Sequence, residues 1–183
     1  MAVNLSARQF KEPDLVDKVE KTLNNMGIDS NCLKLEVTES CVMENPEQAI
    51  DTMNKLREKG IHFSIDDFGT GYSSLSYLKR LPIDTLKIDR SFVSDALNNR
   101  EDREIIRTII SMARNLNIET VAEGVETRDQ KDFLNKEGCK MMQGYYFGRP
   151  MPEDKFEKIL RSQEPAGKPK KSRKSSKSGS KVK

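Results

Sequence analysis

Acidic side chains recur in the strand-like segments of this sequence, and their types define the chemistry to consider first. Glu36, the pair Asp66 and Asp67, and Glu123 each lie in or directly after a run of aliphatic residues, and Lys87 lies in another such run. Burying several carboxylates together is very costly unless a lysine or a metal ion compensates their charge. Carboxylate and amide oxygens suit Mg²⁺ or Mn²⁺, and the single histidine of the chain excludes the usual histidine-rich zinc site.

Side chains alternate between the two faces of a strand, and this alternation brings the polar residues to one face. Leu33, Leu35 and Val37 share one face of their segment, so Glu36 lies on the other. If the aliphatic faces meet the helices, the polar groups converge on one inner face. Polar residues at the carboxyl ends of the strands of a (β/α) barrel are typical of catalysis. The other residues placed on this face are Asn4, Asp66, Lys87, Asp89 and Glu123.

Each of these residues also has an ordinary structural explanation when it is taken alone. Glu36 or Glu123 could be a surface carboxylate, and Asp66 and Asp67 could cap the turn that follows them. Lys87 could form a structural pair with any nearby carboxylate. The functional interpretation rests on the whole set, because the set could be buried together only with compensating cations.

The elements that must position these residues alternate along the chain. Six strand-like segments are separated by amphipathic helical segments, with no hairpin turns between them, which predicts a parallel α/β sheet. The expected strands cover residues 3–6, 33–38, 61–66, 85–89 and 118–123, with a sixth within 140–147. The expected helices cover residues 14–26, 46–59, 74–80, 102–115, 128–137 and 152–160.

Length and composition exclude several classes of protein. The chain has 183 residues, 33% of them charged, which predicts one domain with a tail. No apolar run approaches the ~20 residues of a membrane helix, and the first residues lack the pattern of a secretory signal. The three cysteines are far apart and form no CxxC pair, so neither a disulfide framework nor a zinc knuckle is expected. We therefore expect a reduced, cytoplasmic protein.

Charge is distributed unevenly along the chain. Residues 165–183 carry eight Lys or Arg and no acid, so the formal net charge of +3 becomes −5 when this stretch is left out. We predict a globular part over residues 1–162 and a disordered, Lys/Ser-rich tail over 163–183. Such a tail could attach weakly to nucleic acid or anionic lipid. Its low specificity favours a solubilising tail without a specific nucleic-acid partner.

Six segments follow one another along the chain: residues 4–6 (NLS), 35–40 (LEVTES), 66–75 (DDFGTGYSSL), 86–90 (LKIDR), 122–126 (AEGVE) and 143–147 (QGYYF). Taken in this order, they resemble the motifs of the EAL domain family of bacterial cyclic di-GMP phosphodiesterases. The resemblance runs from residue 3 to about residue 160 and implies a TIM-like (β/α) barrel that hydrolyses cyclic di-GMP to linear pGpG.

The resemblance also implies a role for each matching residue. It implies hydrolysis by two Mg²⁺ or Mn²⁺ ions, which stabilise charge on the attacking and leaving oxygens, and a homodimer through residues 68–77. The implied metal ligands are Asn4, Glu36, Asp66, Asp67 and Glu123. Lys87 is implied to contact the metal-bound water, and Lys87 and Glu123 are the implied catalytic residues. Glu39 is implied to support the loop after Asp67. Asp89 and Gln143 are implied to lie near metal or substrate.

The tripeptide Glu-Ala-Leu that names the family occurs nowhere in this sequence. In the family that glutamate is a metal ligand. The family barrel has eight strands, whereas six are expected here. We therefore predict an incomplete barrel with open strand edges near Asn4 and Gln143 and exposed apolar faces. This chain is expected to hydrolyse cyclic di-GMP weakly or not at all. The alternative is a degenerate EAL-like module that binds nucleotide or a protein partner without hydrolysis.

Overall fold

The computed structural model describes residues 1–71 and 74–163 of the chain. The chain divides into two compact units, Met1–Arg149 and Pro150–Lys183, and each is described by itself. The predicted division into residues 1–162 and a disordered tail over 163–183 stays a prediction, because residues 164–183 lie outside the described residues. No helix within the described ranges is long and apolar enough to cross a membrane.

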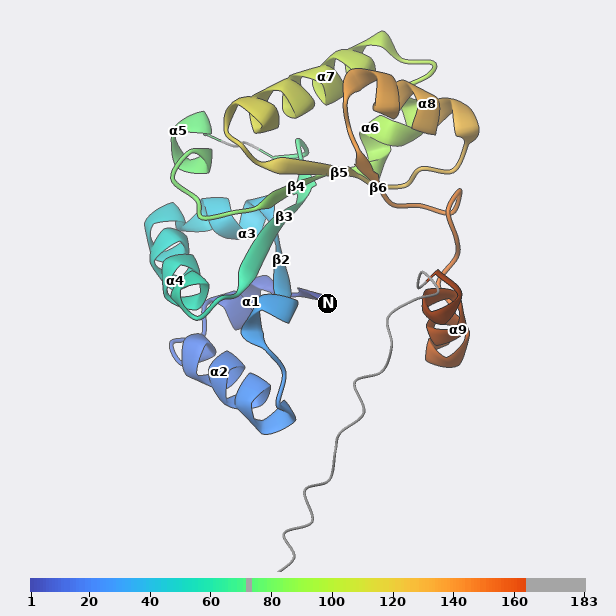
Figure 1. Cartoon of the computed structure of the whole chain (residues 1–183). Helices are drawn as coiled ribbons and strands as arrows, with labels where there is room; N and C mark the ends of the chain where they lie inside the picture. The colour runs from blue at the N-terminus through green and yellow to red at the C-terminus, as the bar shows by residue number, and fades with distance from the viewer. Residues whose placement is uncertain (72–73, 164–183) are drawn as a thin grey trace, which may run out of the picture. The chain divides into compact units, whose positions relative to one another are not determined.

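The first unit is built on one parallel sheet of six strands, as the sequence predicts. The strands follow one another in chain order across the sheet, and every neighbouring pair is parallel. Figure 1 shows the strands curving, with the longer helices along their outer side, which is an incomplete (β/α) barrel. The strands are β1 (Ala2–Asn4), β2 (Lys34–Thr38), β3 (His62–Phe68), β4 (Thr85–Ile88), β5 (Glu119–Ala122) and β6 (Met141–Met142).

The longer α-helices agree with the expected ones to within three residues at each end, whereas three short α-helices and the 3-10 helix Ser30–Cys32 were not predicted. The unpredicted helices α1, α3 and α6 each begin within three residues of the end of a strand. Ser6, Thr38 and Asp89 are their N-caps and accept backbone N–H bonds. The helices are α1 (Ala7–Phe10), α2 (Leu15–Met26), α3 (Glu39–Glu44), α4 (Pro46–Glu58), α5 (Leu75–Leu78), α6 (Arg90–Asp95), α7 (Arg100–Asn115), α8 (Arg128–Glu137) and α9 (Glu153–Gln163).

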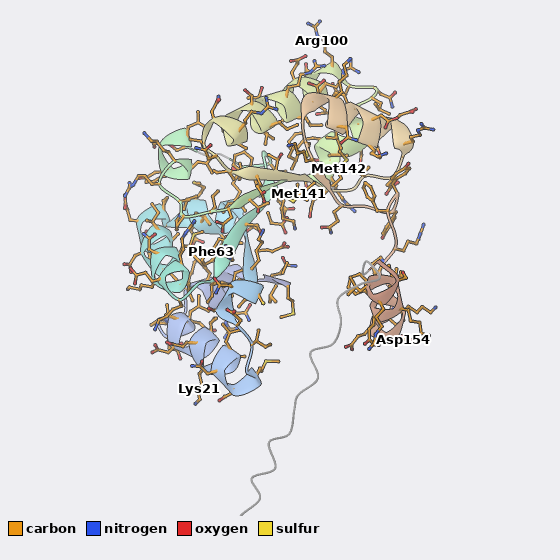
Figure 2. The ribbon with its side chains drawn as sticks, viewed as in Figure 1. Lys21, Phe63, Arg100, Met141, Met142 and Asp154 are labelled. Atoms are coloured by element: carbon orange, nitrogen blue, oxygen red, sulfur yellow. The ribbon has the colours of Figure 1, made fainter. Side chains whose placement is uncertain are left out.

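The core lies between the aliphatic faces of the strands and the helices. Phe63, labelled in Figure 2, and Leu86 are fully buried on β3 and β4. Met53 of α4, Ile106 of α7 and Leu134 of α8 are also fully buried. Burial of one such side chain stabilises the fold by about 1.5–3 kcal/mol, so the outer side of the sheet carries most of the packing energy. The inner face is left to polar side chains.

The two edges of the sheet are β1 and β6, which are the strands that the sequence places beside the open ends. An apolar groove of about 320 Å³ lies along β1 and α2, and its lining includes Met1, Val3 and Met26. These three side chains are exposed, as is Met141 of β6. The predicted open edges and exposed apolar surface are therefore present in the first unit.

The second unit contains the amphipathic helix α9 in its described part. Phe156, Ile159 and Leu160 are spaced to share one face of the helix, and all three are exposed.

Candidate active site

A bulge in β3 brings two consecutive carboxylates to the same site. The pairing of β3 with β4 shifts between Ile65 and Phe68, so three steps along β3 match two along β4. Asp67 lies in this bulge with a left-handed φ of 54°, and its N–H donates to Asp66 Oδ1 over 3.1 Å. Strict alternation would place Asp66 and Asp67 on opposite faces, and the extra residue removes that separation. The alternation rule could not have shown this.

Lys87 joins three strands at the inner face of the sheet. Its Nζ lies 2.8 Å from Glu36 Oε2, 2.9 Å from Asp66 Oδ1 and 2.7 Å from Glu123 Oε1. The Lys87 side chain is 8% exposed, so these contacts are largely shielded from water. The structure therefore brings together four of the residues that alternation placed on one face.

The electrostatics of this cluster favour added positive charge. Burial alone would lower the pKa of Lys87, but hydrogen bonds to Glu123, Glu36 and Asp66 outweigh that effect and raise it, so the ammonium stays charged. Burial raises the pKa of Glu123, and Lys87 offsets this only in part. Burial and the charge of Asp66 also raise the pKa of Asp67. One ammonium group therefore does not compensate the carboxylates that surround it.

The donor set fits a hard divalent cation. Oxygen atoms of Asp66, Asp67 and Glu123 all lie within 4.8 Å of one another. The hydroxyl of Ser64 is buried on the same face of β3 as Asp66 and has no hydrogen-bond partner in the described part of the chain. An all-oxygen cluster with excess negative charge and a buried hydroxyl nearby suits Mg²⁺, Mn²⁺ or Ca²⁺ rather than zinc.

Asn4 lies at the margin of the cluster. It pairs in register with Glu36 across β1 and β2, so it is the nearest β1 residue to that carboxylate. It is exposed on the edge strand.

Glu39 supports the loop that follows the bulge. It is the first residue of α3, is 1% exposed, and accepts the N–H of Gly69 at 2.8 Å. A Cβ on Gly71 would lie 2.8 Å from Glu39 Oε1, so glycine lets this part of the loop approach the carboxylate closely. The structure thus places Glu39 against the loop rather than in the cation cluster.

Asp89 and Gln143 lie on two sides of Glu123. Asp89 caps α6 and lies close to Asp67; burial would raise the pKa of Asp89, but the bonds it accepts from Ser91 outweigh burial and lower it. Gln143 lines a hollow of about 500 Å³ together with Glu123 and Tyr145. The hollow extends the site away from the carboxylates.

Several residues of this hollow were not predicted as site residues. Arg90 and Ser91 come from the first turn of α6, and Tyr145 follows β6. The guanidinium of Arg149 lies 4.6 Å from the centre of the Tyr145 ring. Arg90 and Tyr145 lie inside the LKIDR and QGYYF segments, so their position in those segments was the available signal.

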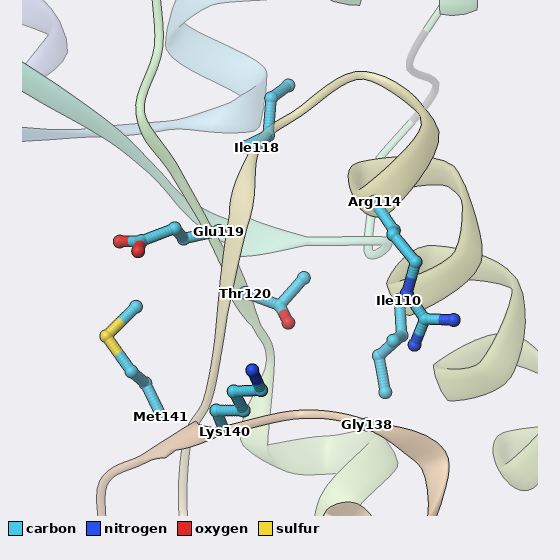
Figure 3. Close-up of a pocket in the computed structure, with 8 residues that line it drawn as sticks. All are labelled: Ile110, Arg114, Ile118, Glu119, Thr120, Gly138, Lys140 and Met141. Atoms are coloured by element: carbon cyan, nitrogen blue, oxygen red, sulfur yellow. The ribbon is translucent and has the colours of Figure 1, made fainter.

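Another hollow, of about 290 Å³, lies at the opposite end of the sheet. Figure 3 shows its lining, which includes Arg114, Thr120 and Lys140. It meets β5 and β6 near their amino ends, whereas the carboxylates gather at the carboxyl ends of the strands. It contains no converging acidic set among the described residues, so the chemistry belongs to the other end.

The fold and the site define an incomplete (β/α)-barrel domain with an acidic centre suited to divalent cations at the carboxyl ends of its strands. The chain belongs to the EAL domain family, whose model matches residues 1–150.

Relatives with assigned functions are longer signalling proteins. The chain is 48% identical over 162 residues to the cyclic di-GMP phosphodiesterase NbdA of Pseudomonas aeruginosa, covering 88% of this chain and 21% of NbdA. It is 46% identical over 156 residues to the bifunctional diguanylate cyclase/cyclic di-GMP phosphodiesterase MucR of the same species, covering 85% of this chain and 23% of MucR. The chain thus spans about a fifth of the length of the curated relatives it matches.

Three solved structures share the fold of this chain and are 34–46% identical to it in sequence. The PaMucR phosphodiesterase in complex with c-di-GMP superposes with a TM-score of 0.83 at 46% identity, over 85% of this chain and 63% of that chain. The EAL domain of Mycobacterium smegmatis DcpA gives 0.82 at 38% identity, over 88% and 72%. Klebsiella pneumoniae BlrP1, solved with manganese and cyclic di-GMP, gives 0.75 at 34% identity, over 81% and 38%.

Proposed function

We propose that this chain is the site-bearing part of a cyclic di-GMP phosphodiesterase domain that hydrolyses cyclic di-GMP to linear pGpG at a centre holding two divalent cations. The observation that carries the proposal is the convergence of Asp66, Asp67 and Glu123 oxygens within 4.8 Å, beside a buried Lys87. Relatives named as cyclic di-GMP phosphodiesterases support the substrate.

The cations would be held by Asp66, Asp67 and Glu123, with Glu36 and Asn4 beside them. Bound Mg²⁺ or Mn²⁺ would activate water and neutralise the charge of the phosphodiester. The hard oxygen ligands suit either ion, and the manganese complex of BlrP1 favours testing Mn²⁺ first.

Lys87 has a separate task in this proposal. Because its pKa is raised, it stays protonated and donates hydrogen bonds throughout. Its ammonium holds Glu36, Asp66 and Glu123 in fixed positions, and it can donate to an entering oxygen only by giving up one of these three contacts. The catalytic contribution of Lys87 is thus orientation and charge stabilisation rather than proton removal.

The hollow beside Glu123 would receive the remainder of the nucleotide. It is lined by the side chains of Arg90 and Gln143, which offer a cationic and an amide donor beside the acidic centre. Tyr145 adds an aromatic surface to the same hollow. Such a combination suits a ligand with phosphate and base groups.

A second candidate function is a module that binds cyclic di-GMP or a protein partner without hydrolysing it. The observation that favours it is the exposure of Asn4 on an edge strand. Fewer ligands on an open edge would hold a second cation loosely, which would lower the rate.

The test is cyclic di-GMP turnover by the purified chain in Mg²⁺ and Mn²⁺, with nucleotide binding measured in parallel. We expect weak turnover that Glu123→Ala abolishes. Glu119→Ala is the matched control, because Glu119 is an exposed carboxylate at the other end of β5. Turnover that survives Glu123→Ala would contradict the proposed site. Binding without turnover by a folded chain would establish the second function.

Two further expectations belong to the proposal. A homodimer is proposed through residues 68–77, of which Tyr72 and Ser73 lie outside the described residues; Leu75 in this segment is 63% exposed. Sedimentation analysis of Leu75→Glu tests it, since the charge should favour the monomer. A cytoplasmic location is proposed because Cys32, Cys41 and Cys139 are free thiols, which reducing compartments maintain.

A further inference from the structure

Asp67 has a backbone conformation that neighbouring groups must hold in place. Its φ of 54° is left-handed, a region that residues with a side chain adopt infrequently. Thr70 stabilises the turn, since its hydroxyl donates to the carbonyl of Asp67 over 2.8 Å. This bond fixes the backbone of the turn, but the direction of the Asp67 carboxylate depends on its other contacts.

The first turn of α6 reaches the Asp67 carboxylate through Asp89. The N–H of Ser91 donates to Asp89 Oδ1 over 2.9 Å, and the Ser91 hydroxyl donates to the same oxygen. The carboxyl group of Asp89 lies close to that of Asp67. Ser91 therefore fixes the rotation of the carboxyl group against which Asp67 rests.

The next residue of α6 reaches the same turn from its apolar side. A Cβ on Gly69 would lie 2.9 Å from Cε2 of Phe92, so the ring lies directly against the Gly69 backbone. On its polar side, Gly69 donates its N–H to Glu39. Gly69 is therefore held between a buried carboxylate and the Phe92 ring, two residues after Asp67.

The same helical turn also contacts the segment directly after β5, which carries Glu123. A Cβ on Gly124 would lie 2.5 Å from Arg90 Cβ, so α6 packs closely against the residue after Glu123. Helix α6 thus contacts both the turn that follows Asp67 and the residue that follows Glu123.

We propose that the first turn of α6 is a positioning element for the cation site, in which Ser91 acts on Asp67 through Asp89 and Phe92 acts on it through Gly69. The effect on cation affinity rests on the proposed function, whereas the effect on the loop does not. Ser91 and Phe92 act through other residues, so their substitution alters the arrangement of the ligands and removes none of them.

The first experiment compares Phe92→Leu with Phe133→Leu. Both phenylalanines are partly buried and pack against the core, but Phe133 lies on α8. Amide hydrogen exchange of Gly69 and Thr70 and the dissociation constant for Mn²⁺ are measured in both variants, together with Tm. We expect both variants to lose stability, but only Phe92→Leu to speed exchange at Gly69 and to weaken Mn²⁺ binding, by roughly tenfold.

Equal changes in exchange and in Mn²⁺ affinity in the two variants would overturn the inference, because a general loss of packing would explain them. If the unaltered chain binds no Mn²⁺, the proposed function fails, and the exchange rates at Gly69 still decide the role of Phe92. Ser91→Ala is expected to weaken Mn²⁺ binding, and Ser91→Thr, which keeps the hydroxyl, to restore it. Equal affinity in these two variants would remove Ser91 from the proposal.

Discussion

Substituting Lys87 with methionine removes the ammonium group that joins three carboxylates on the inner face of the sheet. Glu36, Asp66 and Glu123 are 15%, 17% and 18% exposed, and in the described part of the chain no other salt bridge reaches them. Removing one partner of a buried ion pair leaves uncompensated charge and typically costs about 3–5 kcal/mol. For a protein of this size that corresponds to a fall in Tm of roughly 10 °C.

Added cation should reverse much of this loss. If the cluster holds divalent ions, Mn²⁺ supplies the positive charge that Lys87→Met removes, so Mn²⁺ should stabilise the variant more than the unaltered chain. A ligand at a hundred times its dissociation constant stabilises the folded state by about 2.7 kcal/mol. The assay is denaturant unfolding with and without Mn²⁺.

The matched control is Lys59→Met. Lys59 pairs with Glu20 over 2.9 Å, but the two side chains are 45% and 42% exposed. A pair so exposed contributes at most about 1 kcal/mol, and Mn²⁺ should not affect the variant selectively. A Lys87→Met variant as stable as Lys59→Met would refute the reasoning, because the three carboxylates would then tolerate one another without a cation.

Three shorter predictions follow from other parts of the same unit. Gly124→Ala should lower the stability by about 1–3 kcal/mol in denaturant unfolding, because Gly124 has a φ of 68° and an added Cβ would clash with Arg90. Mn²⁺ affinity, followed by calorimetric titration, should fall on acidification at a higher pH than for ordinary carboxylates, because burial raises the pKa of Glu123 and of Asp67 and protons compete with the cation. The free energy of unfolding without cation should change in the opposite direction. It should rise as the pH falls through the range in which Glu123 and Asp67 take up protons, because the folded state binds these protons more tightly than the unfolded state. Val3→Lys should reduce the binding of a hydrophobic dye, since Val3 lines the exposed apolar groove.

The parallel sheet could be predicted because its signals are local. Each strand has an aliphatic stripe, and α2 and α8 end at Gly27 and Gly138, both left-handed in the structure. The short helices after Ser6, Thr38 and Asp89 could not be separated from loops, since they are too short to show a helical period. Only their N-caps mark them.

The candidate site could be predicted only where the alternation of side chains along a strand determines which face a residue occupies. Alternation places Glu36 and Lys87 on one face, and the structure brings their charged atoms to 2.8 Å. It gives no reason for Asp67 to join Asp66, because the bulge depends on how β3 pairs with β4. The contact of Phe92 with Gly69 depends likewise on tertiary packing, for which a single sequence offers no periodic signal.

The distribution of the site over the sheet determines which of its parts an open barrel weakens. Glu36, Asp66, Lys87 and Glu123 lie on or directly after β2, β3, β4 and β5, and each of these strands has a neighbour on both sides. The cluster around Lys87 is therefore held by complete strand pairing within this chain. Asn4 and Gln143 come instead from the edges, on β1 and directly after β6. A chain of this extent should keep the arrangement of its central carboxylates and lose precision at the residues that would complete the cation shell and contact the nucleotide. Low activity would then reflect weak edge contacts rather than a disordered centre, and adding structure beside β1 should raise the rate without altering the Lys87 cluster.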